Sequence, residues 1–351
     1  MMNKLFFLLF LFFVLQIKSQ DTVKVNLELS PAEQAELDYN SGVEAAKSGS
    51  FTLASTLFSR CLSIKPNFEK ALFNRSVAYY KLHLLDSALA DINMALKSNP
   101  ANAEYFYNKS LVYYGKNDKD SQSVALDNCL KLNGTHSEAA YYKGILCFQE
   151  NDINRAIGFY SVSLISKPNQ VFALNDIGSC FRVKQNIDSA IYFYKKAIAI
   201  DSGLSFVFNN LGSAFFAKKD YKQAINAYTK ALNLDKLNYN AMLNRGAAYL
   251  EDQKLDAAKR DFEEIIAEKP TNSFAYNNLA SIAIKNKDYK SAVELAGRAI
   301  ELDVNNGAAY YNRGVANQML KQDEASCADW KKAFQLGINI AKTVYYSTCS
   351  N

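Results

Sequence analysis

Proline, glycine and histidine are scarce in this sequence, and each shortage argues against a class of protein. The 351 residues include five Pro and 14 Gly, too few for many tight turns or for a β-sandwich. With two His and no Cys-x-x-Cys pair, no metal ligand set is present, so we expect neither a metal nor another cofactor. The net charge of +5 includes no long run of like charge, which argues against a nucleic-acid partner.

Catalytic motifs are also missing. The sequence contains no GxSxG turn, no HExxH helix, no Walker phosphate loop and no GxGxxG turn. Its two histidines, His83 and His136, fall near predicted helix ends, which leaves no candidate for a catalytic triad. We therefore expect a protein that is not an enzyme and has no catalytic residues.

The first twenty residues form a segment of their own. Lys4 gives a positive start, eleven apolar residues from Leu5 to Leu15 follow without a break, and a polar stretch with the small residue Ser19 completes it. This three-part layout predicts a cleaved signal peptide over residues 1–20, and hence a periplasmic or secreted protein. An uncleaved anchor is the alternative, but the apolar run is shorter than the roughly 20 residues that span a bilayer. We expect no transmembrane segment after cleavage.

A period of 34 residues runs through most of the remaining sequence. Pro66, Pro100, Pro168 and Pro270 are separated by multiples of 34, and six glycines keep the same spacing. The period divides residues 35–340 into nine units without insertion or deletion. The units are 35–68, 69–102, 103–136, 137–170, 171–204, 205–238, 239–272, 273–306 and 307–340.

Positions within the unit are consistently small or consistently large. The eighth residue is Gly, Ser or Ala in all nine units, and the twentieth is small in all but one, where Gln122 stands. The twenty-fourth is large in every unit except that of Ala296, and the twenty-eighth is always apolar. Small residues that face large ones at helical spacing predict two closely packed antiparallel helices in each unit.

This pattern resembles the tetratricopeptide repeat over residues 35–340. The second unit carries it as Leu72, Ser76, Tyr79, Ala88, Ile92, Ala95 and Pro100. The resemblance implies an all-α fold, in which nine helix-turn-helix repeats form a right-handed superhelical solenoid. It also implies that the first helix of each repeat lines a concave groove, and it favours a secreted or periplasmic bacterial member of the family.

Both ends of the array carry capping signals. Ser30, Pro31 and Glu33 form the pattern of a helix N-terminus with a capping box, so residues 21–34 are predicted to be a leader that ends in the start of the first helix. Residues 341–351 are predicted to form a capping helix and the C-terminus, because their apolar residues fall on one helical face.

Two of the six cysteines are candidates for a disulfide. If the last unit's second helix and the capping helix form a hairpin that turns near Ile338, Cys327 and Cys349 each lie eleven residues from the turn. Antiparallel packing would place them at the same height, and an exported protein retains disulfides. Two free thiols are the alternative that the sequence leaves open.

The candidate peptide-binding residues come from the groove that the resemblance implies, where positions two, five, six, nine, twelve and thirteen point inward. Position six is asparagine in seven units, as Asn40, Asn74, Asn108, Asn210, Asn244, Asn278 and Asn312. A carboxamide offers one acceptor and two donors, so a row of them could grip an extended peptide. The alternative is that neighbouring helices or water satisfy each asparagine.

Aromatic residues concentrate on the same wall in the first four units. Those at position five are Tyr39, Phe73, Tyr107 and Tyr141, and those at position twelve include Tyr80 and Tyr114. Aromatics are enriched at binding sites, although these could instead stack on one another and stiffen the wall. Tyr142 and Asp176 interrupt the asparagine row in the fourth and fifth units.

The leading functional hypothesis is a non-catalytic protein–protein interaction scaffold outside the cytoplasm, which binds an extended segment of a protein or peptide partner in its groove. A cell-envelope glycan or peptidoglycan binder that uses the groove aromatics is the alternative. The inward charges are mixed, which suits a neutral peptide or glycan better than DNA.

Overall fold

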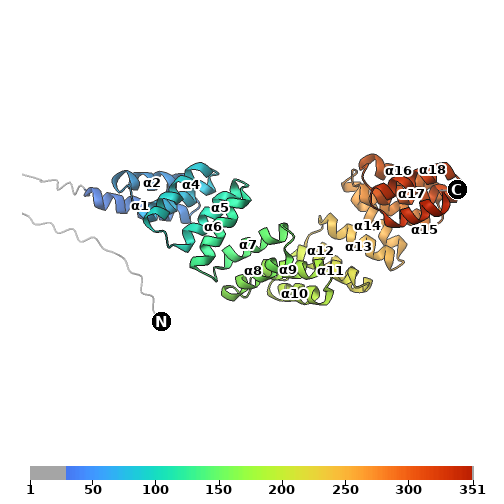
Figure 1. The fold of residues 1–351 in the computed structure, drawn as a ribbon, viewed down its shortest axis with the longest axis horizontal. Helices are drawn as coiled ribbons and strands as arrows, with labels where there is room; N and C mark the ends of the chain where they lie inside the picture. The colour runs from blue at the N-terminus through green and yellow to red at the C-terminus, as the bar shows by residue number, and fades with distance from the viewer. Residues whose placement is uncertain (1–28, 350–351) are drawn as a thin grey trace, which may run out of the picture. The chain divides into compact units, whose positions relative to one another are not determined.

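The computed structural model describes residues 29–349, and these residues form 19 α-helices with no strand (Figure 1). The first six helices are α1 (Pro31–Lys47), α2 (Phe51–Ile64), α3 (Glu69–Lys81), α4 (Leu85–Ser98), α5 (Ala103–Gly115) and α6 (Lys119–Leu132). The next six are α7 (Ser137–Gln149), α8 (Ile153–Ser166), α9 (Val171–Val183), α10 (Ile187–Ile200), α11 (Ser205–Ala217) and α12 (Tyr221–Leu234). The last seven are α13 (Tyr239–Glu251), α14 (Leu255–Glu268), α15 (Ser273–Lys285), α16 (Tyr289–Leu302), α17 (Gly307–Met319), α18 (Asp323–Gln335) and α19 (Asn339–Thr348). The predicted signal peptide lies outside the described residues.

The helices follow one another as hairpins with the period of the sequence. From α3 to α17, each odd-numbered helix begins 34 residues after the one before it. Each odd-numbered helix packs against the even-numbered helix that follows it, and each even-numbered helix packs against the next hairpin wherever both lie in one compact unit. The first compact unit ends at Ser98 and holds α1–α4, and the second begins at Asn99 and holds α5–α19.

The small eighth position of a repeat accepts the ring of its own twenty-fourth residue. A Cβ atom added to Gly212 would lie 2.6 Å from the ring of Tyr228, and one added to Gly144 would lie 2.6 Å from the ring of Tyr160. Such distances are too short for any side chain, so glycine lets the two helices of a hairpin approach closely. The rings fill the space and are almost completely buried.

The turn inside each hairpin corrects one expectation from the sequence. We inferred few tight turns from the scarcity of glycine, yet every repeat turns sharply between its two helices. In the first repeat Gly49 adopts a positive φ of 79° there. The other eight repeats place a non-glycine residue in the left-handed region at the same position, as His83, Asn117, Asn151, Gln185, Lys219, Gln253, Lys287 and Lys321. The fold therefore makes most of these turns with lysine, glutamine or histidine, which composition does not mark as turn formers, and two with asparagine, which is one.

The predicted capping elements are present at both described ends. The side chain of Ser30 accepts a hydrogen bond from the backbone N–H of Glu33, and the Glu33 carboxylate accepts one from the backbone N–H of Ser30, which completes the capping box before α1. At the other end α19 begins at Asn339, two residues before the predicted cap.

The sequence left two states open for the last two cysteines, and the structure has the bonded one. Cys327 of α18 and Cys349, directly after α19, form a disulfide with their Cα atoms 5.7 Å apart. Four other cysteines are buried and unbonded.

The described residues lack two further features. No helix among residues 29–349 has both the length and the apolar character that crossing a membrane requires. The same residues contain no cluster of His, Cys, Asp and Glu that could hold a metal ion.

A candidate binding wall on the first helices of the repeats

The odd-numbered helices of the second compact unit form the candidate site. Neighbouring odd-numbered helices from α9 to α17 touch one another, so their side chains form one continuous wall. Positions two and six of a repeat lie one helical turn apart on the same face of such a helix. We call the face of α9, α11, α13, α15 and α17 that carries positions two, five, six and nine the inner wall.

Three asparagines of the predicted row link one repeat to the repeat before it. The side-chain amide of Asn210 donates to Oδ1 of Asn175 at 2.9 Å, and that of Asn244 donates to Oδ1 of Asn209 at 3.0 Å. Asn312 donates in the same way to Asn277 at 2.8 Å. The amides of Asn210 and Asn244 thus make one hydrogen bond each between helices, and that of Asn312 makes a second one to the hydroxyl of Ser281 at 2.8 Å, as the alternative interpretation expected. The Oδ1 atoms of these three residues make no hydrogen bond within residues 29–349.

The receiving asparagines were missed by the sequence interpretation. Asn175, Asn209 and Asn277 occupy position five, where we considered only aromatic residues. The signal was present as pairs of asparagines exactly one repeat and one residue apart, which places them side by side on neighbouring first helices. Position five thus supports position six in the second half of the array.

The other members of the row are not equivalent. Asn40 is exposed, Asn108 is buried, and Asn74 donates to the hydroxyl of Tyr39 at 3.2 Å inside the first compact unit. Asn278 is half-buried, and it has no hydrogen bond within the described part of the chain. The position-five residue of the preceding repeat, which would receive its hydrogen bond, is Leu243, and a leucine side chain offers no acceptor. Asn278 therefore keeps a complete carboxamide for a ligand.

Asp176 lies at the centre of a hydrogen-bonded chain that spans three repeats. Its Oδ2 accepts a hydrogen bond from the hydroxyl of Tyr141 at 3.0 Å, and its Oδ1 accepts one from the side-chain amide of Asn175 at 3.0 Å. The Oδ1 atom of Asn175 in turn accepts a hydrogen bond from Asn210. Burial raises the pKa of Asp176, while the two donated hydrogen bonds act in the opposite direction. Within residues 29–349 no Lys, Arg or His forms an ion pair with it.

The predicted groove aromatics of the first four repeats lie mostly against other rings. Tyr39 packs on Phe58 and Phe68 with ring centroids 6.0 and 4.8 Å away. Tyr141 packs on Tyr142 and Tyr160 in the same manner.

The remaining aromatics of the prediction differ in exposure. Tyr107 contacts the rings of His136 and Tyr142, and Phe73 and Tyr80 are half-buried. Tyr114 differs from the rest, because 57% of its surface is exposed.

A second group of aromatics, at position two, was not singled out from the sequence. Phe172 is 51% exposed and stacks on Phe206 with centroids 5.7 Å apart and ring planes 7° from parallel. Phe274, which lies two repeats after Phe206, is 56% exposed. Each phenylalanine lies one helical turn before the position-six residue of its own helix. The resemblance placed position two on the inner wall, but only its charged residues were considered.

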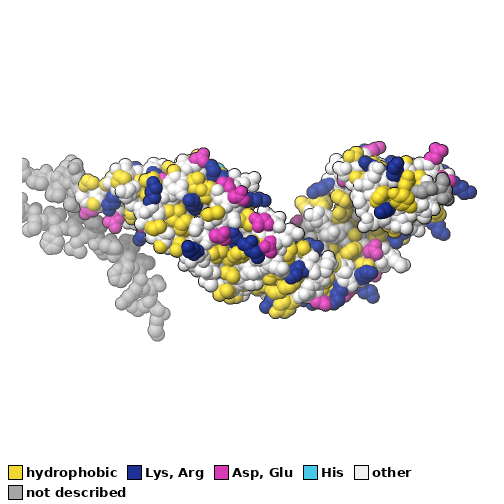
Figure 2. Space-filling model, in the orientation of Figure 1, with side chains coloured by type: hydrophobic (Ala, Val, Ile, Leu, Met, Phe, Trp, Pro, Cys, Tyr) yellow, Lys and Arg dark blue, Asp and Glu magenta, His cyan; other side chains and the backbone are white. Residues whose placement is uncertain are grey.

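The face of the molecule seen in Figure 2 is mixed in charge. Basic and acidic side chains alternate with apolar ones, and no field of a single sign covers it. Together with the polar and aromatic inner wall, this composition is typical of a surface that contacts protein or peptide.

Comparisons with known proteins agree with the repeat pattern. A family profile described as "TPR repeat" matches residues 212–253, and a second, described as "Tetratricopeptide repeat", matches residues 249–313. The matched segments include α12 to α16, and hence the inner-wall residues Asn244 and Asn278.

Two curated relatives match shorter stretches of the chain. One, "Protein STIP1 homolog" of Dictyostelium discoideum, is 36% identical over 71 residues, which cover 20% of this chain and 13% of that protein. The other, "Tetratricopeptide repeat protein 36" of Xenopus tropicalis, is 32% identical over 101 residues, or 28% of this chain and 50% of that protein. The chain thus spans half or less of each of these relatives.

A solved structure matches a larger part. The tetratricopeptide repeat protein from Parabacteroides merdae superposes with a TM-score of 0.60 and 17% sequence identity, covering 70% of this chain and 98% of that one. At this identity the likeness concerns the fold alone. Together with the all-helical structure it confirms the predicted fold class, an all-α solenoid of helical repeats.

Proposed function

We propose that this chain, whose repeats are of the tetratricopeptide type, is a non-catalytic scaffold outside the cytoplasm that binds an extended peptide segment on its inner wall. Proteins built from these repeats generally serve as protein–protein interaction scaffolds, and they are typically non-catalytic. The finer parts of the proposal, the peptide segment and the location, rest on the arguments below.

The stacking of the exposed ring of Phe172 on the half-buried ring of Phe206 is the observation that carries the proposal. Two rings that stack while half of Phe172 remains in water form a flat apolar platform, which costs solvation free energy unless a partner covers it. Exposed aromatics next to polar groups are frequent hot spots of protein interfaces. An apolar side chain of the bound segment would cover this platform.

The polar row beside the platform would hold the backbone of the segment. The Oδ1 atoms of Asn210, Asn244 and Asn312 are acceptors for peptide N–H groups, and Asn278 offers both donors and its acceptor. Because three of the amides are fixed to the first helix of the preceding repeat, they are held in place before a ligand arrives, which lowers the entropy lost on binding. The unpaired carboxylate of Asp176 favours a segment with a basic side chain near the platform.

Two features support a location outside the cytoplasm. The first twenty residues have the composition of a secretory signal. The disulfide between Cys327 and Cys349 is a bond that persists in oxidising compartments and is rare in reducing ones.

The experiment selects peptides from a random library on the purified chain and measures their affinity by fluorescence polarisation. We expect Phe172→Ala combined with Phe206→Ala to weaken binding at least about tenfold, and Asn278→Ala to weaken it by a smaller factor. Tyr192→Ala is the matched control, because Tyr192 is an equally exposed aromatic on α10, outside the inner wall. Unchanged affinity in the double phenylalanine variant would refute the platform.

The structure leaves few exposed aromatic residues to support the glycan-binding alternative. Among the six aromatics predicted for it, only Tyr114 is largely exposed. Retention of the chain on purified cell-wall material, lost on Tyr114→Ala and kept in the double phenylalanine variant, would favour that alternative over peptide binding.

A further inference from the structure

An ion pair recurs between the two helices of several repeats. Position seven is arginine and position twenty-three is aspartate in the second, seventh and ninth repeats, and each arginine makes two hydrogen bonds, of 2.7–2.9 Å, to its aspartate. The pairs are Arg75–Asp91, Arg245–Asp261 and Arg313–Asp329. Each aspartate side chain is nearly buried by the arginine that covers it. The pair fills the space between the first and second helix at that level.

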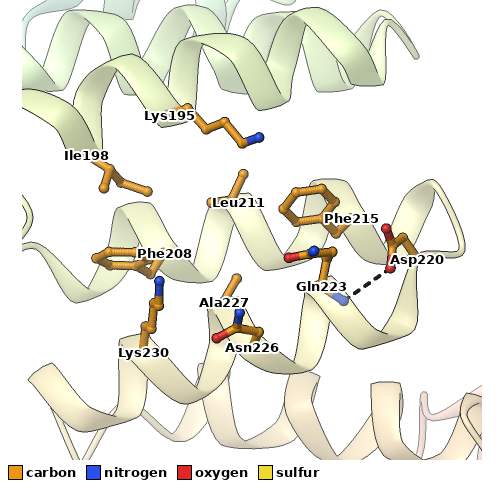
Figure 3. Close-up of a pocket in the computed structure, with 10 residues that line it drawn as sticks. All are labelled: Lys195, Ile198, Phe208, Leu211, Phe215, Asp220, Gln223, Asn226, Ala227 and Lys230. Carbon is orange, nitrogen blue, oxygen red and sulfur yellow. Dashed lines mark hydrogen bonds between the residues drawn. The ribbon is translucent and has the colours of Figure 1, made fainter.

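The sixth repeat lacks both partners of this pair. Leu211 stands at position seven and Ala227 at position twenty-three, and both are buried. A cavity of about 360 Å³ opens at this place, between α10 and α12 and over α11 (Figure 3). Its volume lies in the range of small-molecule sites. The small side chain of Ala227 thus leaves a hollow in the same position where three other repeats hold an ion pair.

The third repeat shows that alanine at position twenty-three opens the hollow. Ala125 occupies that position there, and a cavity of about 260 Å³ lies beside it. Its rim carries Asn128 where the sixth repeat has Lys230. Both cavities thus lie beside an alanine at position twenty-three, and the cavity of the third repeat is lined by one lysine, Lys109, and one aspartate, Asp120.

The cavity of the sixth repeat combines an apolar floor with a cationic rim. Figure 3 shows Phe208, Leu211 and Phe215 on the middle helix α11, while Lys195 comes from α10 and Lys230 from α12 on opposite sides. The Nζ atom of Lys195 lies 5.8 Å from the centroid of the Phe215 ring, and that of Lys230 lies 5.8 Å from the Phe208 ring. Both ammonium groups thus lie close to the aromatic floor.

No carboxylate neutralises these two lysines among residues 29–349. Neither Lys195 nor Lys230 forms a salt bridge there. Asp220 is the one carboxylate among the residues that line the cavity, and its Oδ1 accepts the backbone N–H of Gln223 as the N-cap of α12. The rim therefore has two cations without a counter-ion above an apolar floor.

We propose that this cavity binds a small carboxylic acid with an apolar alkyl or aryl body. Its carboxylate would take the place of the aspartate found in the sister repeats and pair with Lys195 and Lys230. Its apolar body would cover Leu211, Ala227 and the two phenylalanine rings. The residues that line the cavity include no position-two or position-six residue, so the site is independent of the proposed peptide-binding wall.

The test is isothermal titration of the full chain with phenylbutyrate, and with phenylbutanamide, which has the same body without the charge. We expect phenylbutyrate to bind with a stoichiometry of one and the amide to bind at least about tenfold more weakly. Lys195→Gln combined with Lys230→Gln should reduce the affinity for phenylbutyrate by about tenfold or more. Lys196→Gln is the matched control, because Lys196 is an exposed lysine of α10 that lies over Tyr192 and outside the cavity.

A second variant, Ala227→Asp, restores the carboxylate of the sister repeats and should abolish binding. Equal affinity for the acid and the amide would overturn the proposal, as would equal losses in Lys196→Gln and in the double lysine variant. A third arm uses a short peptide that ends in phenylalanine with a free carboxylate. If this peptide binds at the same site more tightly than phenylbutyrate, the ligand is a peptide terminus, and the assignment to a small acid is wrong.

Discussion

Tyr141 of α7 donates a hydrogen bond to Asp176 of α9, across the junction between the fourth and fifth repeats, with 3.0 Å between the hydroxyl oxygen and Oδ2. The tyrosine ends the predicted row of position-five aromatics that begins in the first repeat, and the aspartate interrupts the row of position-six asparagines. Burial also raises the pKa of Tyr141, and the adjacent carboxylate of Asp176 contributes to that rise. The folded chain therefore binds each of these protons more tightly than the unfolded chain does.

The first prediction concerns the pH dependence of stability at Asp176. Burial raises its folded pKa above the ordinary aspartate value of 3.8, so the folded state binds the proton more tightly than the unfolded state. The stabilisation is complete below the unfolded pKa and is lost as the pH rises through the folded pKa. Asp176→Asn removes this dependence and keeps an acceptor for Tyr141. We expect the variant to melt higher than wild type at neutral pH.

Melting curves from neutral pH down to the ordinary aspartate pKa of 3.8 would check this prediction. The advantage of the variant should shrink as the pH falls, because wild-type Asp176 becomes protonated. Asp188→Asn is the control, since Asp188 is an exposed carboxylate of α10 that pairs with Lys218. An advantage that stays constant over this pH range would contradict the role assigned to burial.

The second prediction concerns the close approach of two helices at Gly212. A Cβ atom there would lie 2.6 Å from the ring of Tyr228, which is itself buried between the helices. We expect Gly212→Ala to lower the free energy of unfolding by about 1 to 3 kcal/mol, because the core must shift to admit one methyl group. Chemical denaturation monitored by circular dichroism measures the change.

Gly158 supplies the matched control for that substitution. It lies in the interior of α8, and a Cβ atom added to it would meet nothing within 4 Å. Gly158→Ala should therefore raise the free energy of unfolding by about 0.5 to 1 kcal/mol, through helix propensity alone. Changes of the same sign in both variants would show that propensity, and not the ring contact, decides the outcome.

Contacts within one hairpin could be predicted from the sequence, whereas contacts between repeats could not. Gly212 and Tyr228 lie 16 residues apart in one hairpin, and such pairs recur with the period, so the repeats and their all-α fold could be predicted. The bond from Asn210 to Asn175 joins two repeats and depends on the exact stagger of their helices. That stagger follows from packing, which is why the supporting asparagines were missed.

The turn residues illustrate a second limit of the sequence. Lys219 adopts a φ of 62° between α11 and α12, although lysine has no preference for the left-handed region. The packing of the two helices fixes the turn between them, and it outweighs the small free-energy cost of this backbone conformation. A count of glycines therefore underestimates the number of turns in a repeat array of this kind.

The third prediction concerns the disulfide between Cys327 and Cys349. It closes a loop of sequence separation 22 and ties the end of α19 to α18. Replacing both cysteines by serine should lower the stability of the C-terminal end by about 3 kcal/mol, through the entropy gained by the unfolded chain. Because stability in a repeat array is local, hydrogen exchange should rise in α18 and α19 and stay unchanged in α9 to α12.

The control for the disulfide is Cys61→Ser in α2, at a buried and unbonded cysteine. Its effect should be confined to the first compact unit, with no change in exchange at α19. Hydrogen exchange in α18 and α19 that is as slow in the double serine variant as in wild type would contradict the prediction.

The fourth prediction tests whether the ion pair and the cavity are alternative fillings of one space. Asp261→Ala in the seventh repeat leaves Arg245 half-buried without its partner, so we expect a loss of about 3 kcal/mol in the free energy of unfolding. Arg245→Leu combined with Asp261→Ala copies the pair of residues found in the sixth repeat. The double variant should lose less than Asp261→Ala alone, because no charge is left without a partner. A double-mutant cycle by chemical denaturation gives the coupling between the two residues. Additive losses would mean that the arginine and aspartate act separately, and that their absence in the sixth repeat does not explain why that repeat tolerates a cavity.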